Sequence, residues 1–324
     1  MGDVASPPSI PMVQLSHGGV SLPILGFGMG PNPRVPDEVS KAAALKAIEV
    51  GYRHFDTAPI YLTEKGLGQA ISEALERGII KSREDIFATS KLWCSDVHPH
   101  LVVPALKRSL QALNLEYLDM YMIHWPVSGK PKPPKYPLKE EDFLPFDLKG
   151  VWTAMEECQR LGLTKAIGVC NFTRKKLEQL LAIATIQPAV NQVEVNPKWQ
   201  QKELIKFCKT NGILVMAHSP LGGPLEEHKL VMESNVLQEI AKAKGKSVAQ
   251  IALRWGYEQG IAIVVSSFIK EWMIENLQIF DWELSSEDHE KIGKIPQGRT
   301  LTGWDYLSPI GPYRTFEELW DGDL

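Results

Sequence analysis

Eight short apolar runs divide this chain, and a longer amphipathic segment separates most of them from the next. The runs are ILGFG, RHFDTA, DIFATSKL, LDMYMIHW, KAIGVCNF, PAVNQVEV, ILVMAHSP and IAIVVSSF. Their hydrophobicity is continuous rather than alternating, which is typical of parallel strands buried on both faces. Eight such strands alternating with helices over about 250 residues predict an α/β fold, the closed (β/α)8 or TIM barrel.

The amphipathic segments predict the helices of this barrel. They cover residues 37–50, 63–77, 98–113, 150–161, 173–183, 200–210, a stretch from Ser234, and 247–259. Ser247 and Gln250 have the spacing of a capping box, and Asp37 and Thr63 are predicted to be N-caps. Before the first barrel strand, the segment PMVQLSHGGVSLPIL predicts a β-hairpin.

The composition shows no break that would divide the chain. Residues 1–324 are therefore predicted to form one domain, with 1–11 as a flexible N-terminal arm. Two segments are longer than ordinary loops: 126–148 after the fourth strand, and the C-terminal loop 296–324. Because loops that follow barrel strands surround the mouth of the barrel, both are candidates for substrate selection. A solvated excursion is the alternative for each.

Charge and cysteine content exclude several kinds of partner. The chain is 44% hydrophobic and 23% charged with a net charge of -4, and it has no dense Lys/Arg face for nucleic acid or an anionic membrane. Its four cysteines form no CxxC pair, so neither a disulfide framework nor a metal site is expected. No apolar stretch reaches the roughly 18 residues that span a bilayer, and no signal peptide is evident, so a cytoplasmic protein is expected.

Four polar residues lie at or just beyond the ends of successive predicted strands: Asp56, Tyr61, Lys91 and His124. A tyrosine with its ordinary pKa of about 10 acts as a general acid only if its phenolate is stabilised, and a neighbouring lysine ammonium does this. An aspartate holds that ammonium charged and in place, and a histidine nitrogen orients a carbonyl oxygen. We call these residues the proton-donor group, and together they indicate carbonyl reduction by hydride.

Three glycines, Gly26, Gly28 and Gly30, resemble a dinucleotide-binding loop. Their spacing is GxGxG, however, and no helix opens directly on it, so they are a weak Rossmann signal. They predict a close approach of the backbone to another group at the end of the first strand.

The segments GYRHFDTAPIYLTEKGLG, TKAIGVCNF, SKLWC, IHWP and NQVEV closely resemble the aldo-keto reductase superfamily. The likeness extends from about residue 12 to 320 and is closest to the plant branch that includes codeinone, methylecgonone and chalcone reductases. It implies a barrel with NADPH across its mouth and a catalytic role for the proton-donor group. It also implies that Asn171 and Gln192 hold the nicotinamide carboxamide and that Trp93 and Trp125 wall the substrate pocket. For the two tryptophans, simple core packing is the alternative. The further cofactor-binding positions that it implies are Cys170, His218, Ser219, Leu221, Ser266, Ser267, Glu275 and Asn276.

The chain departs from the family pattern where the adenosine 2'-phosphate of NADPH would bind. Family members have a lysine and an arginine there, but this chain has Ser266 and Trp272. We call these two positions the phosphate clamp. Losing two charge-assisted hydrogen bonds of about 1.5 to 3 kcal/mol each would weaken NADPH binding about a hundredfold or more. NADH is therefore an alternative cofactor. Lys270 lies nearby and is a candidate for partial compensation of the lost charge. Met29, Cys170 and His218 also differ from the family's usual threonine, serine and tyrosine.

Three hypotheses follow from these observations. The first is a reductase of a small aldehyde or ketone, of an alkaloid, polyketide or terpenoid type by the plant resemblance, that uses NADPH or NADH. The second is an isomerase, cyclase or lyase that uses the same group without a bound nicotinamide cofactor. The third is a binding protein without catalysis. The resemblance implies a monomer, and the tryptophans at the mouth, with Trp304 a further candidate, suit bulky, flat ligands.

Overall fold

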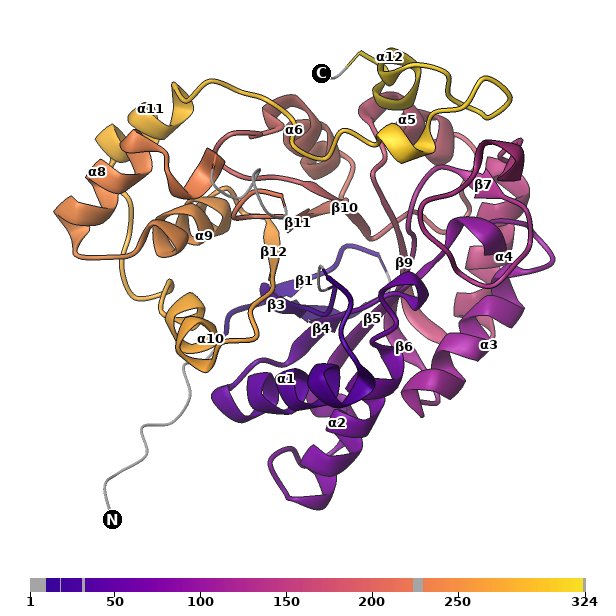
Figure 1. The fold of residues 1–324 in the computed structure, drawn as a ribbon, viewed down its shortest axis with the longest axis horizontal. Helices are drawn as coiled ribbons and strands as arrows, with labels where there is room; N and C mark the ends of the chain where they lie inside the picture. Colours follow the sequence, from indigo (N-terminus) through magenta and orange to yellow (C-terminus); the bar gives the residue numbers. More distant parts are fainter. Residues whose placement is uncertain (1–9, 18, 31–32, 224–229, 323–324) are drawn as a thin grey trace.

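The computed structural model describes residues 10–17, 19–30, 33–223 and 230–322. Its centre is a closed barrel of parallel strands, in which the last strand pairs with the first through Ile263 and Leu25 (Figure 1). In chain order, the barrel strands are β3 (Leu25–Gly28), β4 (His54–Asp56), β5 (Phe87–Leu92), β6 (Leu118–Ile123), β9 (Thr164–Cys170), β10 (Val190–Glu194), β11 (Leu214–His218) and β12 (Ala262–Val265). Seven of them lie within apolar runs and β9 begins one residue before its run, so the predicted barrel is confirmed.

Helices surround this barrel and bury their apolar faces against it. In α3, for example, Val102, Leu106 and Leu113 are fully buried. The helices in the described residues are α1 (Asp37–Val50), α2 (Glu64–Glu76), α3 (Val102–Leu113), α4 (Leu148–Arg160), α5 (Arg174–Leu181), α6 (Lys202–Thr210), α8 (Asn235–Lys244), α9 (Val248–Glu258), α10 (Lys270–Leu277), α11 (Ser286–Gly293) and α12 (Phe316–Trp320). None of them has the length and apolarity needed to cross a bilayer.

The predicted helix starts have different outcomes. The capping box is confirmed, since the Ser247 hydroxyl accepts a hydrogen bond from the Gln250 amide and the Gln250 side chain accepts one from Ser247 N. Asp37 is not an N-cap: Pro36 takes that position, and Asp37 lies in the first turn. Thr63 is the N-cap residue of α2, but its hydroxyl donates to the Met29 carbonyl instead of accepting from the helix.

The helix that follows the last barrel strand is α10, and it was not predicted. Both α8 and α9 precede β12, so the predicted helix 247–259 corresponds to α9 and not to the final helix of the barrel. In α10 the apolar residues Trp272 and Ile274 are exposed, which blurs the amphipathic pattern that identifies a helix in a sequence.

The predicted hairpin closes one end of the barrel. Its strands β1 (Met12–Gln14) and β2 (Ser21–Pro23) pair antiparallel, and Leu22 packs with Phe87, Met120 and Ala189 at the bottom of the barrel. Of the predicted flexible arm 1–11, residues 1–9 lie outside the described part, whereas the carbonyl of Pro11 accepts a hydrogen bond from the Ile24 amide.

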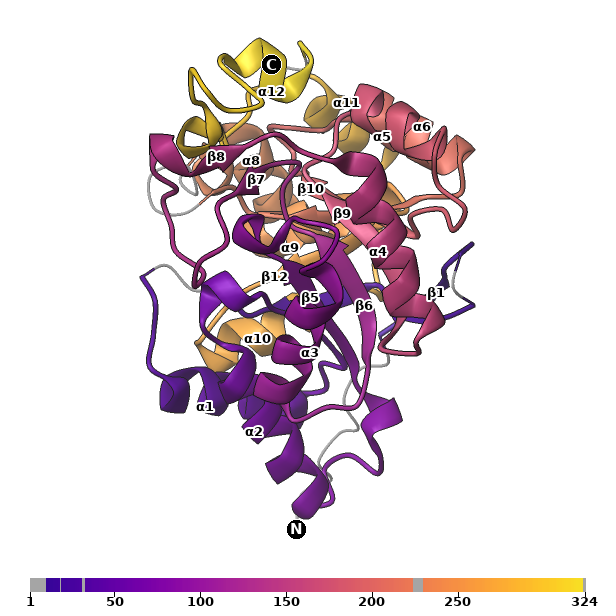
Figure 2. The same ribbon diagram turned by 90° about the vertical axis from the view of Figure 1, so that its right-hand side faces the viewer.

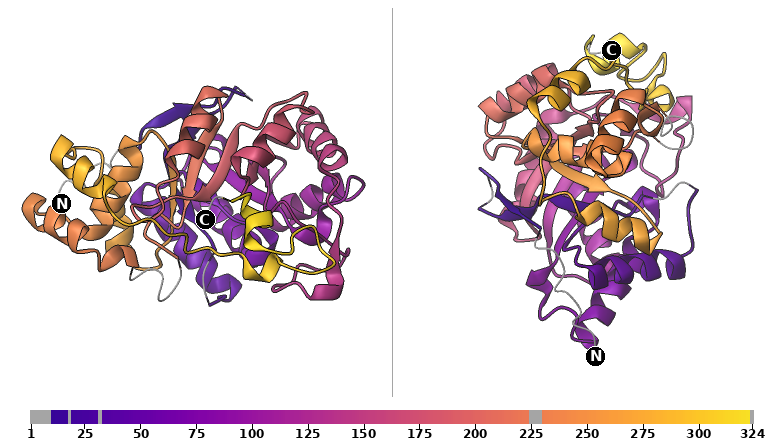
Figure 3. Two further views of the ribbon diagram at one scale, coloured as in Figure 1. Left: turned by 90° about the horizontal axis from the view of Figure 1, so that it is seen from above. Right: turned by 90° about the vertical axis from the view of Figure 1, so that its left-hand side faces the viewer.

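The two long segments lie together at the opposite end. Residues 126–148 contain the short antiparallel pair β7 (Ser128–Gly129) and β8 (Phe143–Leu144), and the described part of the C-terminal loop contains α12. Figure 2 shows α12 beside this pair, and Figure 3 shows the C-terminal loop in yellow at the end of the barrel away from the indigo hairpin. Phe143 and Trp320 share one apolar cluster.

Candidate active site

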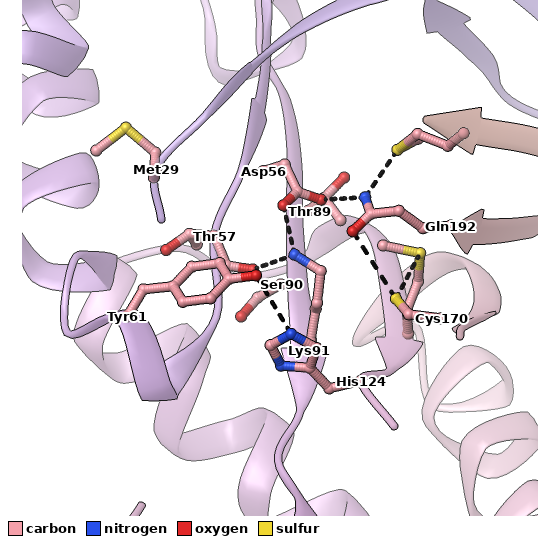
Figure 4. A network of polar contacts seen from close by, with 12 residues as sticks. Met29, Asp56, Thr57, Tyr61, Thr89, Ser90, Lys91, His124, Cys170 and Gln192 are labelled. Atoms are coloured by element: carbon pink, nitrogen blue, oxygen red, sulfur yellow. Dashed lines mark hydrogen bonds and ion pairs between the residues drawn. The ribbon is translucent and has the colours of Figure 1, made fainter. Parts of the chain in front are cut away.

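The parallel register of the barrel brings the proton-donor group together. Asp56, Lys91 and His124 lie at or directly after the C-terminal ends of β4, β5 and β6, which are neighbours in the barrel. Tyr61 comes from the short 3-10 helix Pro59–Tyr61 that follows β4. All four side chains converge on one point (Figure 4).

Lys91 forms a buried ion pair with Asp56. Its ammonium donates to Asp56 Oδ1 and, at 3.1 Å, to the Thr57 carbonyl, and the side chain is fully buried. Burial alone would lower the pKa of Lys91, but the charge of Asp56 outweighs this effect and raises it. The lysine therefore stays cationic. The contact with Thr57 was not predicted, because it uses a backbone carbonyl that any residue would supply.

Tyr61 is held between the lysine and the histidine. Its hydroxyl lies 3.2 Å from His124 Nε2, and Lys91 Nζ lies 5.0 Å from the centre of its ring. Burial raises the pKa of Tyr61 to about 12, while the charge of Lys91 acts in the opposite direction. The phenol is thus protonated at neutral pH, and a cation is in place to stabilise the phenolate that proton release would leave.

The His124 imidazole is neutral in this environment. Burial lowers its pKa well below the ordinary value, and the positive charge of Lys91 adds to the shift. Its backbone carbonyl accepts a hydrogen bond of 3.0 Å from Asn171 Nδ2, which fixes the end of β6. A neutral imidazole that faces the tyrosine hydroxyl can orient a carbonyl oxygen without competing as a strong acid.

The two predicted carboxamide residues lie beside this group. The Asn171 Oδ1 atom is 3.3 Å from His218 Nε2, and Gln192 Nε2 donates to Asp56 Oδ2 at 2.8 Å. Their side-chain oxygens remain suitable acceptors for the amide protons of a carboxamide. Cys170 is buried beside Gln192. Burial lowers the pKa of His218 to about 3, so the imidazole ring is uncharged and offers a surface on which a flat heterocycle can stack.

The backbone is unusual at the rim of this site. Leu62, Asn171 and Ser219 have positive φ angles of 61°, 61° and 50°. Such conformations are uncommon for residues other than glycine and cluster at functional sites. Ser219 also contacts the imidazole of His218 through its hydroxyl at 3.1 Å, and Leu221 packs against the core.

The three glycines approach side chains rather than solvent. A Cβ atom on Gly26 would lie 2.4 Å from His54 Nδ1, and one on Gly30 would lie 3.2 Å from the Tyr61 ring. The predicted close approach is therefore confirmed, with His54 and Tyr61 as two of the groups approached. Met29 between them is fully buried.

Of the phosphate clamp, Ser266 lies directly after β12, and Trp272 lies in the first turn of α10. Ser266 is exposed, and the Ser267 hydroxyl exchanges hydrogen bonds with the backbone of Ile269. Trp272 is 57% exposed, and Phe268 and Ile269 beside it are exposed as well. An apolar surface thus stands where the family resemblance implies two cations.

The last two predicted cofactor residues are engaged within the protein. Glu275 accepts a hydrogen bond from the Ser247 hydroxyl, and Asn276 is buried close to the Tyr52 hydroxyl. The structure therefore does not bring the side chains of Glu275 and Asn276 into the open part of the segment.

Aromatic side chains pack together beside the proton-donor group, and we call the cluster of Trp93, Trp125, Tyr136, Tyr306 and Trp320 the aromatic wall. Trp93 lies 5.3 Å from His124 between ring centres, and Trp125 stacks on Tyr306 at 3.9 Å. Tyr136 of the long loop contacts both Trp93 and Tyr306. Both predicted tryptophans are almost fully buried within this wall.

Three of these aromatic positions were not identified in the sequence. Tyr136, Tyr306 and Trp320 come from the long loop and the C-terminal loop, and their large side chains in those segments are the only sequence signal for them. Trp304, by contrast, is 66% exposed and packs on Phe316 outside the wall. Within the described ranges, no group of three or more histidine, cysteine or acidic residues could hold a metal ion.

A closed barrel with the proton-donor group at the C-terminal ends of its strands is the arrangement expected of a carbonyl reductase. Comparison with known proteins identifies the family. The model of the aldo/keto reductase family matches residues 24–296. The chain therefore belongs to the aldo-keto reductase family and is an aldo-keto reductase.

Several curated plant enzymes match this chain along nearly its whole length. A 7-acetyl-epi-neemfruitin B aldo-keto reductase from Melia azedarach is 56% identical over 98% of both chains. Deoxymugineic acid synthase 1 from Zea mays is 55% identical over 94% of this chain and 97% of its own. NADPH-dependent codeinone reductase 1-5 from Papaver somniferum is 55% identical over 96% of this chain and 98% of its own.

A solved structure also shares the fold. The Bombyx mori aldo-keto reductase in complex with NADP superposes with a TM-score of 0.84 at 32% identity, covering 94% of this chain and 99% of that one.

Proposed function

We propose that this protein reduces an aldehyde or ketone of plant specialised metabolism, with Tyr61 as the proton donor. The observation that carries the proposal is the contact of a protonated, partly buried tyrosine with a neutral histidine on one side and a lysine cation on the other. This arrangement serves proton delivery to a carbonyl oxygen.

A nicotinamide dinucleotide, when bound, supplies the hydride for the carbonyl carbon. The residues of the chain do the rest. His124 orients the carbonyl oxygen toward the Tyr61 hydroxyl, and Tyr61 gives its proton to that oxygen as negative charge develops. Lys91 stabilises the resulting phenolate, Asp56 keeps Lys91 in place, and solvent restores the proton of Tyr61.

The substrate class follows from the aromatic wall and from the relatives. Rings from Trp93, Trp125 and Tyr306 favour a flat or polycyclic molecule with little charge. The names of two relatives refer to 7-acetyl-epi-neemfruitin B and to codeinone. We therefore expect a polycyclic alkaloid, polyketide or terpenoid carbonyl, reduced by a cytoplasmic monomer.

The cofactor is NADPH in our proposal, with weakened discrimination against NADH. In this proposal Asn171 and Gln192, which lie beside the proton-donor group, hold the carboxamide of either cofactor, and the His218 ring stacks on the nicotinamide. The exposed Ser266 and Trp272 offer the 2'-phosphate no positive charge. This feature also motivates a second candidate, an isomerase, cyclase or lyase that uses Tyr61 without cofactor.

Replacement of the tyrosine hydroxyl tests the proposal. Tyr61→Phe is expected to lower kcat for NADPH-dependent reduction of an aromatic aldehyde by about 10² to 10⁴-fold, because only the general acid is lost. Tryptophan fluorescence should show unchanged NADPH binding. The control is Tyr117→Phe, which alters a tyrosine that contacts Arg83 and Lys165 before β6. Full activity of Tyr61→Phe would contradict the assigned role, and turnover without cofactor would favour the second candidate.

A further inference from the structure

The side chain of Gln192 reaches across the barrel interior to the proton-donor group. It lies on β10, whereas Asp56 lies on β4, and these strands are not neighbours in the barrel. Gln192 Nε2 nevertheless donates to Asp56 Oδ2 at 2.8 Å (Figure 4). The hydrogen bond joins two opposite parts of the barrel wall.

Each oxygen of the Asp56 carboxylate thus has its own donor. Lys91 donates to Oδ1 and Gln192 donates to Oδ2. The Gln192 side-chain amide cannot have its oxygen and nitrogen exchanged, because the amide oxygen would then face an Asp56 carboxylate oxygen with no proton between them. Its oxygen instead faces Cys170 Sγ at 3.9 Å, a weak donor.

Sulfur atoms surround this amide on its other sides. Met216 Sδ lies 3.0 Å from Gln192 Nε2, and Met122 Sδ lies 3.9 Å from Cys170 Sγ. Thioethers are only weak acceptors and have no proton to donate. In the described part of the chain, the side-chain donors to Asp56 are Lys91 and Gln192, and without the amide Oδ2 would lose its side-chain donor.

We propose that Gln192 is a positioning residue: its amide nitrogen holds the Asp56 carboxylate ionised and oriented, so that Asp56 holds Lys91 under Tyr61. This inference rests on the proposed carbonyl reduction. It extends the carboxamide role expected for Gln192, because the amide oxygen remains available to a carboxamide while the nitrogen serves Asp56. One side chain then links the cofactor to the proton-donor group.

Loss of the amide would act through the Asp56 carboxylate. A hydrogen bond to a carboxylate favours its ionised form. Without the Gln192 amide, Asp56 would lose one of its two side-chain donors, and Lys91 would lose a fixed counter-charge. The titratable groups of the surrounding elements that face this pair are Tyr61, His54, His124, Cys170 and His218.

Two substitutions of Gln192 should change the pH profile of kcat in opposite directions. Gln192→Leu removes the donor, so the acid limb should move up by about one to two pH units, the equivalent of one charge-assisted hydrogen bond. At pH values on the wild-type acid limb, kcat should fall about 10- to 100-fold. Gln192→Glu places two carboxylates together, and these share one proton at low pH. That variant should retain activity at pH 6 and lose it as the pH rises toward 8 and the shared proton leaves.

The measurement is kcat against pH at saturating NADPH, with an aromatic aldehyde as the probe. Asn191→Leu is the matched control, since Asn191 is an equally buried amide on β10 that bonds to the Phe172 carbonyl instead. Its profile should keep the wild-type shape. NADPH affinity, followed by tryptophan fluorescence, separates the two roles of Gln192, because kcat at saturation does not depend on affinity.

The possible outcomes are distinct. Opposite shifts in the Leu and Glu variants support the inference. Weaker NADPH binding with unchanged profiles of kcat in both variants would overturn it and leave only the carboxamide role. An equal loss at every pH in all three variants would overturn it in favour of simple packing. If the wild-type protein reduces no carbonyl with NADPH, the proposed function itself fails, and this result is visible before any variant is compared.

Discussion

Burial sets the protonation state of each residue in the proton-donor group. It keeps Tyr61 protonated and His124 neutral, because both charged forms lose hydration. Lys91 is the exception, since Asp56 supplies a counter-charge that outweighs the cost of its burial. The same low-polarity environment therefore yields an acid, a neutral hydrogen-bonding group and a permanent cation within one site.

In our proposal, the two residues of the phosphate clamp set the preference between NADPH and NADH. Restoring both cations of the phosphate clamp, through Ser266→Lys and Trp272→Arg together, should strengthen NADPH binding about a hundredfold or more, since each charge-assisted hydrogen bond contributes about 1.5 to 3 kcal/mol. NADH lacks the 2'-phosphate, so its dissociation constant should change little. Fluorescence titration with both cofactors measures this difference.

Ile274→Arg is the control for that experiment. It adds a positive charge to the exposed surface of α10 outside the clamp positions. If Ile274→Arg strengthens NADPH binding as much as the double variant does, net charge rather than clamp geometry explains the effect. If the double variant leaves the preference between the two cofactors unchanged, the assignment of the clamp is wrong.

Contacts within the site differ in how far a sequence can predict them. The convergence of Asp56, Lys91 and His124 was predictable, since they end adjacent parallel strands. The bond from Gln192 to Asp56 was not predictable. It depends on the width of the closed barrel and on the rotamers of both side chains, and residues 136 positions apart in sequence give no signal of such contact.

At the scale of secondary structure, buried strands were easier to predict than exposed elements. Each barrel strand has a continuous apolar run, because both of its faces are covered. The helix α10 has no such pattern, since Trp272 and Ile274 face outward. The course of the C-terminal loop was also not predictable, because it is fixed by a few polar anchors rather than by periodic packing.

Glu194 at the end of β10 is one of these anchors. Its buried carboxylate accepts hydrogen bonds from Thr300 N at 3.1 Å and from Leu301 N at 2.8 Å. Farther along the loop, Asp321 pairs with Lys176. These bonds bring the segment with Tyr306 and Trp320 against the aromatic wall, so the loop is positioned to shape the substrate pocket.

Glu194→Gln should loosen this loop. In this variant an NH2 group replaces one carboxylate oxygen, although the backbone N–H groups of the loop need acceptors there. The change removes charge-assisted hydrogen bonds of about 1.5 to 3 kcal/mol. We expect faster hydrogen exchange in residues 300–320 and a KM about tenfold higher or more for a polycyclic ketone. Glu203→Gln, an exposed glutamate on α6, is the control. An unchanged exchange rate in the loop of Glu194→Gln would show that Glu194 is not an anchor.

For the whole molecule, the barrel, the hairpin and the C-terminal loop form one arrangement around a single mouth. The hairpin covers one end of the barrel, and the proton-donor group, the aromatic wall and the C-terminal loop lie at the other. We propose that this arrangement behaves as one domain. Its plant relatives match along nearly the same length. The departure from the family pattern that the sequence shows lies in the clamp.

The most direct test of the account is whether the hydrogen delivered to the carbonyl carbon comes from the nicotinamide. The wild-type protein is incubated with an aromatic aldehyde and NADPH that carries deuterium at both positions of C4, and the alcohol is analysed by mass spectrometry. The account predicts one deuterium on the carbinol carbon of every product molecule. Product without deuterium, or conversion of the substrate in cofactor-free buffer, would contradict it.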